Sequence, residues 1–268
     1  MGEKDSLQKK SLKFQDSYTF LHIFMIYLLC SEDWGGFVLP YGSRNPKKEC
    51  RWDMDIREDN GEGIDSWKEV TLIYNAALKQ IETRMEILNE EFQHVHQYNP
   101  IEHIKARIKT PESIVKKLKR NGYESTIDNM VKHVNDIAGI RVICSFTSDI
   151  YRIADMISEQ RDLQVLTVKD YITFPKTSGY KSYHMIITVP VYLSDRTVDA
   201  KVEIQIRTVA MDFWASLEHK IHYKLEGDAP EHIRSELVEC AKMVTDLDAR
   251  MLKLNEELLI LSREREKE

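Results

Sequence analysis

Apolar residues recur at steps of three and four from Trp67 to Phe92, which predicts a long helix with one buried face. The pattern breaks at Pro100. A second helix is expected after Thr110, because threonine caps helix N-termini and the proline that follows suits the first helical position. This helix should end near Gly122, since glycine is favoured just past a helix C-terminus.

Four later segments have the apolar, aromatic or alternating composition of strands, namely 139–146, 163–172, 183–193 and 197–208. Helices are expected between the first two, at about 149–160, and after the last, at about 209–223. From Glu231 onward apolar residues repeat with a period of about 3.5 residues, which predicts a long helix with a packing seam. That seam would face either its own domain or another subunit.

This order of elements predicts an α+β fold, in which a mixed β-sheet is flanked by helices and followed by a long C-terminal helix. Three parts are expected along the chain. They are an N-terminal extension at 1–63, a main domain at 64–230, and a C-terminal helix at 231–268 that could serve oligomerisation.

The extension contains an apolar segment, YTFLHIFMIYLLC at 18–30, with lysines before it. The segment is shorter than the ~20 residues that span a bilayer, and no signal-peptide cleavage site follows it. Three interpretations stay open: a buried or amphipathic segment, a membrane-associating extension, or sequence that is not normally translated. We favour the third, with Met54 as an internal start, so that 1–63 is poorly ordered or not natively translated and no membrane partner is expected.

The chain of 268 residues has a net charge of −6, which argues against a surface that coats nucleic acid broadly. Any basic site must therefore be local. The four cysteines form no CxxC pair and no zinc-ligand spacing, which indicates free thiols in a reducing cytoplasm.

The strand VEIQIRT at 202–208 alternates apolar and polar residues. One face would be buried, and the other would present Glu203, Gln205 and Arg207 in a row. Glu203 could hold a magnesium ion or accept a hydroxyl proton. An ordinary half-buried strand has the same pattern, so alternation alone does not decide between a site and a wet surface.

A local basic site is predicted at 105–120, where seven residues are basic and one is acidic. The N-terminus of the helix expected here offers free N–H groups to an anion. Ser113 and Lys117 lie four residues apart on one helix face, and Lys109 comes just before the helix, so the three could grip a polyphosphate. The alternative is a solvated basic helix face.

Asp136 stands just before a buried strand, and Arg141 lies within it. An aspartate at a strand's start is a natural magnesium ligand where phosphates are near, although it is also common as a cap or turn residue. An arginine in an apolar run needs a partner, because burying it unpaired is costly. That partner could be a carboxylate, a phosphate or the flat face of a base.

The segment 170–184 is predicted to form an irregular loop between two strands, since it contains a proline and a glycine. It carries Lys176, Tyr180, Lys181 and His184. Basic groups around an exposed aromatic ring suit a nucleotide, because the ring stacks on the base and the cations meet the phosphates. The alternative is a surface loop without a ligand.

Four motifs in order, RIKTPESIVKK, DIAGIR, FPKTSGYKSYH and EIQIRT with FWASLEHKIHYK, resemble the synthetase domain of the RelA/SpoT proteins. Within that family the chain looks most like the small alarmone synthetases of the RelQ type. The resemblance covers the chain from Ile64 to its C-terminus. It implies a nucleotidyltransferase-like synthetase domain and a GTP pyrophosphokinase. Such an enzyme moves the β,γ-pyrophosphate of ATP to the ribose 3′-hydroxyl of GDP or GTP and makes ppGpp or pppGpp.

The resemblance also implies roles for residues on the ATP side. Arg107 and Arg141 would sandwich the adenine, while Lys109, Ser113 and Lys117 would hold the phosphates.

On the catalytic and acceptor side, the resemblance implies that Asp136 and Glu203 bind Mg²⁺ and that Glu203 is also the candidate base for the 3′-hydroxyl. Tyr180 would stack on guanine. The remaining acceptor-site residues would be Lys176, Lys181, His184, Gln205 and Arg207.

By the same resemblance the protein is expected to be a cytoplasmic homotetramer, with pppGpp or RNA as a possible allosteric partner. Two other functions stay open. One is a toxic relative that modifies adenine nucleotides or the 3′ end of tRNA, and the other is a nucleotide- or RNA-binding regulator with weak catalysis. The sequence does not choose between GDP and GTP.

Overall fold

The computed structural model describes residues 66–96, 98–224 and 229–265. All of them lie in one compact unit, Met54–Glu268. The apolar segment at 18–30 and the internal methionine lie outside the described residues. Among the helices that are described, none combines the length and the apolar character that crossing a bilayer requires.

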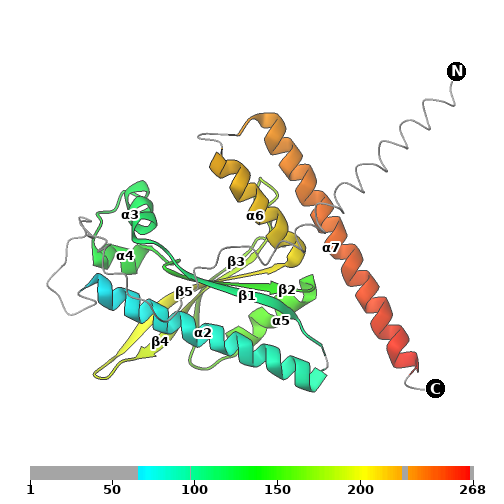
Figure 1. Ribbon diagram of the computed structural model, residues 1–268, viewed down its shortest axis with the longest axis horizontal. Helices are drawn as coiled ribbons and strands as arrows, with labels where there is room; N and C mark the ends of the chain where they lie inside the picture. The colour runs from blue at the N-terminus through cyan, green and yellow to red at the C-terminus, as the bar shows by residue number, and fades with distance from the viewer. Residues whose placement is uncertain (1–65, 97, 225–228, 266–268) are drawn as a thin grey trace, which may run out of the picture. The chain divides into compact units, whose positions relative to one another are not determined.

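The described residues form a five-stranded mixed sheet with the order β1-β2-β5-β4-β3 (Figure 1). Strands β2 and β5 run parallel, and the other neighbouring pairs are antiparallel. The mixed sheet confirms the predicted α+β fold. The strand bounds are β1 Ile101–Ile108, β2 Ala138–Cys144, β3 Gln164–Asp170, β4 Tyr183–Tyr192 and β5 Thr197–Thr208.

Helices flank this sheet. Their bounds are α2 Trp67–His96, α3 Pro111–Arg120, α4 Ile127–His133, α5 Thr147–Ser158, α6 Val209–Lys224 and α7 Glu231–Arg265. Helix α2 crosses one face of the sheet and contacts β1, β2, β4 and β5 (Figure 1). The alternation of β5 places Val202, Ile204 and Ile206 in the core, where each is fully buried. The opposite face of β5 is therefore free to carry polar groups.

Strand β1 was not predicted from the sequence. It lies at an edge of the sheet and most of its residues are partly or fully exposed, so charged residues alternate with the few apolar ones. Its register places Arg107 opposite Gly139 and Lys105 opposite Arg141. Because directly opposite residues share a sheet face, two basic side chains of β1 and one of β2 lie on the same face of the sheet.

Helix α7 contacts α6 and α5, and Ala241 and Val244 in its first half are buried. The indole Nε1 of Trp214 in α6 donates to the carbonyl of Leu237, at 3.0 Å. Apolar residues further along α7 are exposed, including Leu258 at 63%. The predicted seam therefore packs on its own domain at one end and is exposed at the other.

Candidate active site

The polar row of β5 is a connected chain of hydrogen bonds. The amide Nε2 of Gln205 donates to Glu203 Oε2 at 2.8 Å, and Arg207 Nη2 donates to Gln205 Oε1 at 3.0 Å. The register places Glu203 opposite Gly139 of β2, and Gln205 opposite both Arg141 and His184. The row is thus the centre of a polar sheet face rather than a wet edge.

Two lysines converge on Asp136 at one end of this face. Lys109 Nζ is 2.9 Å from Oδ2 and Lys117 Nζ is 2.8 Å from Oδ1. Burial would raise the pKa of Asp136, but the hydrogen bonds from Lys117 and Lys109 outweigh it and hold the pKa below its usual value. One carboxylate faces two ammonium groups, so the cluster has a spare positive charge for an anion.

Ser113 lies in the first turn of α3, beside this cluster. Its backbone N–H donates to the N-cap hydroxyl of Thr110 at 3.4 Å, and its own hydroxyl accepts from that hydroxyl at 3.0 Å. The predicted cap and the proline at the helix start are both confirmed. The serine hydroxyl and the lysines of Asp136 therefore belong to one segment, from the end of β1 to α3.

Glu203 is also held by a residue of β4. His184 Nδ1 lies 3.4 Å from Glu203 Oε1. Burial would raise the pKa of Glu203, but hydrogen bonds from His184 and Gln205 outweigh it and hold the pKa below its usual value, against the repulsion of Asp136. The two carboxylates are therefore ionised at neutral pH and close enough to feel each other's charge.

An aromatic cluster stands at the other end of the face. The Tyr180 hydroxyl is 2.9 Å from His184 Nε2 and accepts from Arg207 Nη2 at 2.5 Å. Lys176 Nζ lies 4.8 Å from the ring centre of Tyr171 and 4.6 Å from that of Tyr180. The predicted combination of cations and an aromatic ring is thus present on one loop, with a second tyrosine that the sequence did not single out.

Asp212 is a further site residue that sequence reasoning missed. It is 2% exposed in the first turn of α6. Its Oδ1 accepts from Arg141 Nη1 at 3.0 Å and from Arg207 Nη1 at 3.1 Å. The partner expected for the strand arginine is therefore a carboxylate. Arg141 Nε is buried without a hydrogen bond in the described part of the chain.

Arg107 and Lys181 belong to none of the clusters described above. Arg107 is exposed on β1, and a Cβ added to Gly139 would lie 4.0 Å from its Cγ and 4.0 Å from the carbonyl oxygen of Glu203. Because glycine has no side chain, the sheet surface between Arg107 and Glu203 carries no side chain at Gly139. Lys181 is not brought to the network, because it lines a small pocket against α7.

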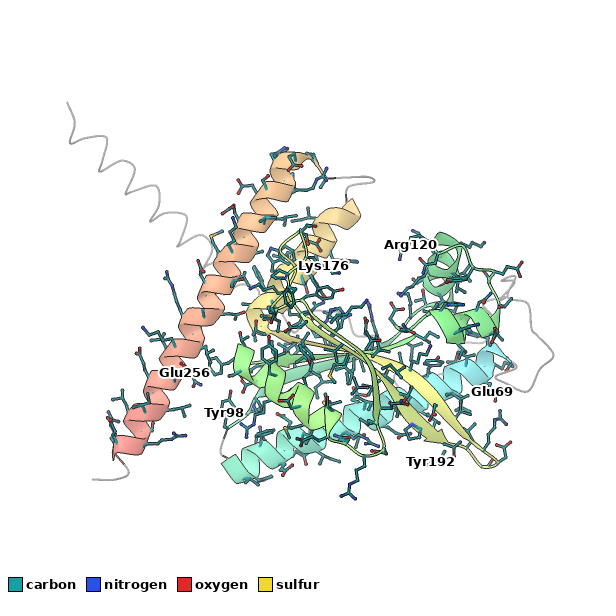
Figure 2. All side chains as sticks on the ribbon, turned by 180° about the vertical axis from the view of Figure 1, so that it is seen from behind. Glu69, Tyr98, Arg120, Lys176, Tyr192 and Glu256 are labelled. Carbon is teal, nitrogen blue, oxygen red and sulfur yellow. The ribbon has the colours of Figure 1, made fainter. Side chains whose placement is uncertain are left out.

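The network lies on the sheet face opposite α2. The segment 171–182 between β3 and β4, which carries Tyr171 and Tyr180, is the tyrosine loop. Figure 2 labels Lys176 on this loop and Arg120 at the end of α3, which both stand over this side of the sheet. Among the described residues no group of three or more histidine, cysteine, aspartate or glutamate side chains is placed to hold a metal. Magnesium needs only one or two carboxylates when substrate phosphates supply other oxygens, and Asp136 and Glu203 fit that requirement.

Comparison with known proteins decides which family has this arrangement. Residues 106–228 match the family model described as the region found in RelA / SpoT proteins. GTP pyrophosphokinase YwaC of Bacillus subtilis is 49% identical over 195 residues, which cover 73% of this chain and 93% of YwaC. The chain belongs to the RelA/SpoT family.

Solved structures of the RelA/SpoT family have the same fold. Small alarmone synthetase 2 of Bacillus subtilis superimposes with a TM-score of 0.65 at 48% identity, over 71% of this chain and 98% of that one. Small alarmone synthetase 1 of the same organism, solved bound to its product pppGpp, gives 0.66 at 31% identity, over 71% and 97%. These likenesses confirm the family and the fold that the sequence motifs indicated.

Proposed function

We propose that this RelA/SpoT-family protein is a GTP pyrophosphokinase that transfers the β,γ-pyrophosphate of ATP to the ribose 3′-hydroxyl of GDP or GTP. The 3′-oxygen bonds to the β-phosphorus, and the bond from that phosphorus to the oxygen shared with the α-phosphorus breaks. That oxygen leaves with AMP, and the hydroxyl proton is lost. The observation that carries the proposal is the pair Asp136 and Glu203, which lies between a lysine cluster and an aromatic cluster on one sheet face.

On the donor side, Lys109, Ser113 and Lys117 would bind the ATP phosphates. The two lysines bring two positive charges to one carboxylate, and the start of α3 adds its free N–H groups. Arg107 and Arg141 lie next to Gly139, which has no side chain. A flat adenine would lie there between the two guanidinium planes. Pyrophosphoryl transfer needs positioning and neutralised charge, and this side would supply both.

Mg²⁺ is the cofactor that the two carboxylates would hold. Bound there with the phosphates, it would neutralise charge on the transferred group. Asp136 and Glu203 are suited to a hard cation because their pKa values are held below the usual range. Glu203 also faces the acceptor side through His184, so it would be the residue that receives or directs the proton of the 3′-hydroxyl.

On the acceptor side, Tyr180 would stack on guanine. Lys176 and His184 stand beside its ring, and would meet the acceptor's phosphates and ribose. Gln205 and Arg207 form the floor between this ring and Glu203. Lys181 is left out of this proposal, because its side chain lines the pocket at α7.

The exposed apolar residues of α7 support a homo-oligomer, and the resemblance to the small alarmone synthetases suggests a tetramer. Met251, Leu254 and Leu258 are 49%, 53% and 63% exposed, and they recur at steps of three and four. A helix stripe of this kind suits a second copy of the chain. A cytoplasmic location and an allosteric response to pppGpp or RNA complete the proposal.

A labelled-transfer experiment tests the function. The purified protein is incubated with Mg²⁺, ATP labelled at the γ-phosphate, and GDP, GTP, AMP or tRNA in separate reactions. We expect label on GDP and GTP, and none on AMP or tRNA. Label on tRNA or AMP alone would replace the acceptor in this proposal, and label on none of the four would overturn the enzymatic function.

A further inference from the structure

The tyrosine loop touches helix α7 at Gly179, the residue before the proposed stacking ring. Gly179 has a φ of +87°, and a Cβ built on it would lie 2.5 Å from the Cβ of Ala241. The contact is therefore one of backbone against a small side chain. The loop is closed on itself beside this point, because Gly179 N donates to the carbonyl of Lys176 at 2.8 Å and Lys176 N donates to that of Tyr180 at 3.2 Å.

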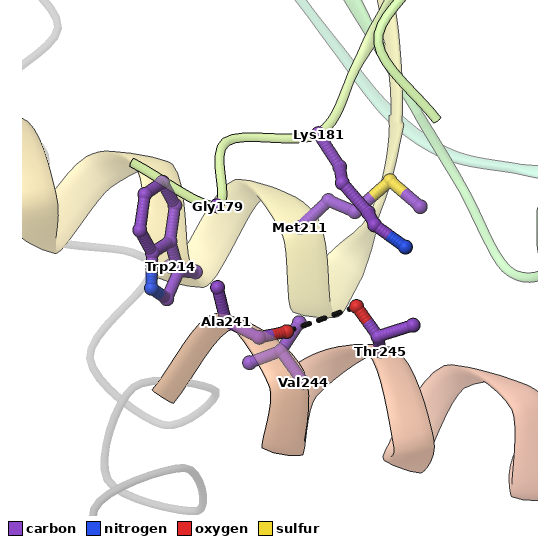
Figure 3. A pocket seen from close by; sticks show the side chains of 7 residues that line it. All are labelled: Gly179, Lys181, Met211, Trp214, Ala241, Val244 and Thr245. Atoms are coloured by element: carbon purple, nitrogen blue, oxygen red, sulfur yellow. Dashed lines mark hydrogen bonds between the residues drawn. The ribbon is translucent and has the colours of Figure 1, made fainter. Parts of the chain in front are cut away.

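Helix α6 also packs beside the contact between Gly179 and Ala241. In Figure 3 Trp214 stands beside Gly179 and Ala241, and Met211 lies beside Lys181. A Cβ on Gly179 would be 4.0 Å from Trp214 Cζ2. The indole of Trp214 donates a hydrogen bond to the carbonyl of Leu237. The side chain that packs against the loop is therefore itself attached to α7.

A second contact joins α7 to the end of β5. Asp248 Oδ2 accepts from the hydroxyl of Thr208 at 2.7 Å. Thr208 follows Arg207, which donates to the Tyr180 hydroxyl at 2.5 Å. Lys181, the residue after the ring, is on the α7 side and is attracted to Asp248. Helix α7 therefore meets the chain just before Tyr180, just after it, and beside the arginine that binds its hydroxyl.

We propose that Ala241 of α7 is a positioning residue for the acceptor nucleotide. It does not touch the nucleotide. Its small side chain lets the backbone of Gly179 come close to α7. This close approach sets the position of the Tyr180 ring relative to Gln205 and Arg207. The proposal rests on the assignment of Tyr180 to the acceptor in the proposed function. It also reassigns Lys181 from the substrate's phosphates to the contact with α7.

A role in packing alone would predict something different. If the contact only stabilises the fold, enlarging Ala241 lowers stability and affects both substrates alike. If it positions the ring, the KM for GTP rises while the KM for ATP does not, because the lysines that would hold ATP lie in α3 and in the turn before it. The ratio of the two KM values therefore separates positioning from packing.

The main test is Ala241→Leu, with Ala249→Leu as the matched control. Both are the same change on α7, but Ala241 is buried at the loop and Ala249 is exposed. We expect Ala241→Leu to raise the KM for GTP about tenfold or more, since displacing a bound group by a small distance is enough for such losses. The KM for ATP should stay within about twofold, and Ala249→Leu should match the wild type. An unchanged KM for GTP in Ala241→Leu, or an equal rise for ATP, would overturn the proposal.

A second pair of variants covers the case in which Ala241→Leu does not fold. Gly179→Ala should raise the KM for GTP, because its Cβ meets that of Ala241 and its backbone is strained. Adding Ala241→Gly removes the Cβ contact and should recover part of the loss. A double variant no better than Gly179→Ala would contradict the role of Ala241. The wild type is measured in each series, and a wild type without transfer activity would overturn the proposed function instead.

Discussion

Arg207 of β5 forms an ion pair with Asp212 in the first turn of α6, with 3.1 Å between Nη1 and Oδ1. Both side chains are almost fully buried. The same oxygen accepts from Arg141 of the neighbouring strand at 3.0 Å. One carboxylate therefore fixes two arginines from β2 and β5, and its single negative charge leaves the pair with a net positive charge toward the site.

Replacing Asp212 with alanine should destabilise the protein by about 3 kcal/mol, because it leaves buried guanidinium groups without their counter-charge. Asp212→Asn keeps an acceptor oxygen and should cost less. The measurement is urea unfolding, with Asp246→Ala on the exposed part of α7 as a control. Equal stability of Asp212→Ala and the wild type would show that the shared carboxylate does not hold the two arginines.

Lys117→Met should raise the KM for ATP about tenfold, since the variant removes one of the two ammonium groups beside Asp136. Lys119→Met makes the same change on an exposed position of α3 and should leave the KM within about twofold. Initial rates at varied ATP and saturating GTP give the KM for ATP of each variant. If the two variants had the same KM for ATP, the lysine cluster at Asp136 would have no special part in phosphate binding.

Tyr180→Ala should raise the KM for GTP at least about tenfold and leave that for ATP nearly unchanged, because base–aromatic stacking contributes about 1–3 kcal/mol. Tyr180→Phe keeps the ring but loses the hydroxyl that meets Arg207 and His184. It should therefore have a smaller effect than alanine. An alanine variant with the wild-type KM for GTP would exclude stacking on this ring.

Asp248 should make stability depend on pH. Burial raises its pKa to about 6, in spite of the hydrogen bond from Thr208 and the attraction of Lys181. Because the folded-state pKa lies above the unfolded one, the stabilisation is complete below about pH 4 and is lost as pH rises through about 6. Asp248→Asn should therefore be more stable than the wild type at pH 8, by up to about 3 kcal/mol, and lose this advantage near pH 4.

The measurement is thermal or urea unfolding of both proteins across this range. Asp246→Asn, two residues away on an exposed position of α7, serves as the control. A stability difference between Asp248→Asn and the wild type that is the same at pH 4 and pH 8 would show that the carboxylate titrates alike in the folded and unfolded chain.

Local patterns predicted much of the fold and of the site. The alternation around Glu203 predicted β5 with its polar face, and the cap at Thr110 predicted the start of α3 beside the lysines. The motif resemblance indicated the family, which the comparisons confirm. These features depend on residues close together in sequence, so a single chain is enough to recognise them.

Features that depend on distant segments were missed. Strand β1 was not predicted, because an edge strand with one solvated face lacks a continuous apolar run. Asp212 lies in an ordinary helical sequence, and its importance comes from two arginines on separate strands. Lys181 was grouped with Tyr180 because they are adjacent in sequence. Adjacent residues can point in opposite directions, and here Lys181 lines a pocket with α7 residues while the Tyr180 hydroxyl meets Arg207.

The most direct test of the account is the identity and position of the group transferred, compared between the wild type and Glu203→Gln. The protein is incubated with ATP, GTP and Mg²⁺, and the products are examined by phosphorus NMR and mass spectrometry. The account predicts AMP and a guanosine nucleotide with a pyrophosphate on its 3′-oxygen from the wild type, and neither product from Glu203→Gln. Full production of both by the variant, or a wild type that leaves the guanosine 3′-hydroxyl unmodified, would contradict it.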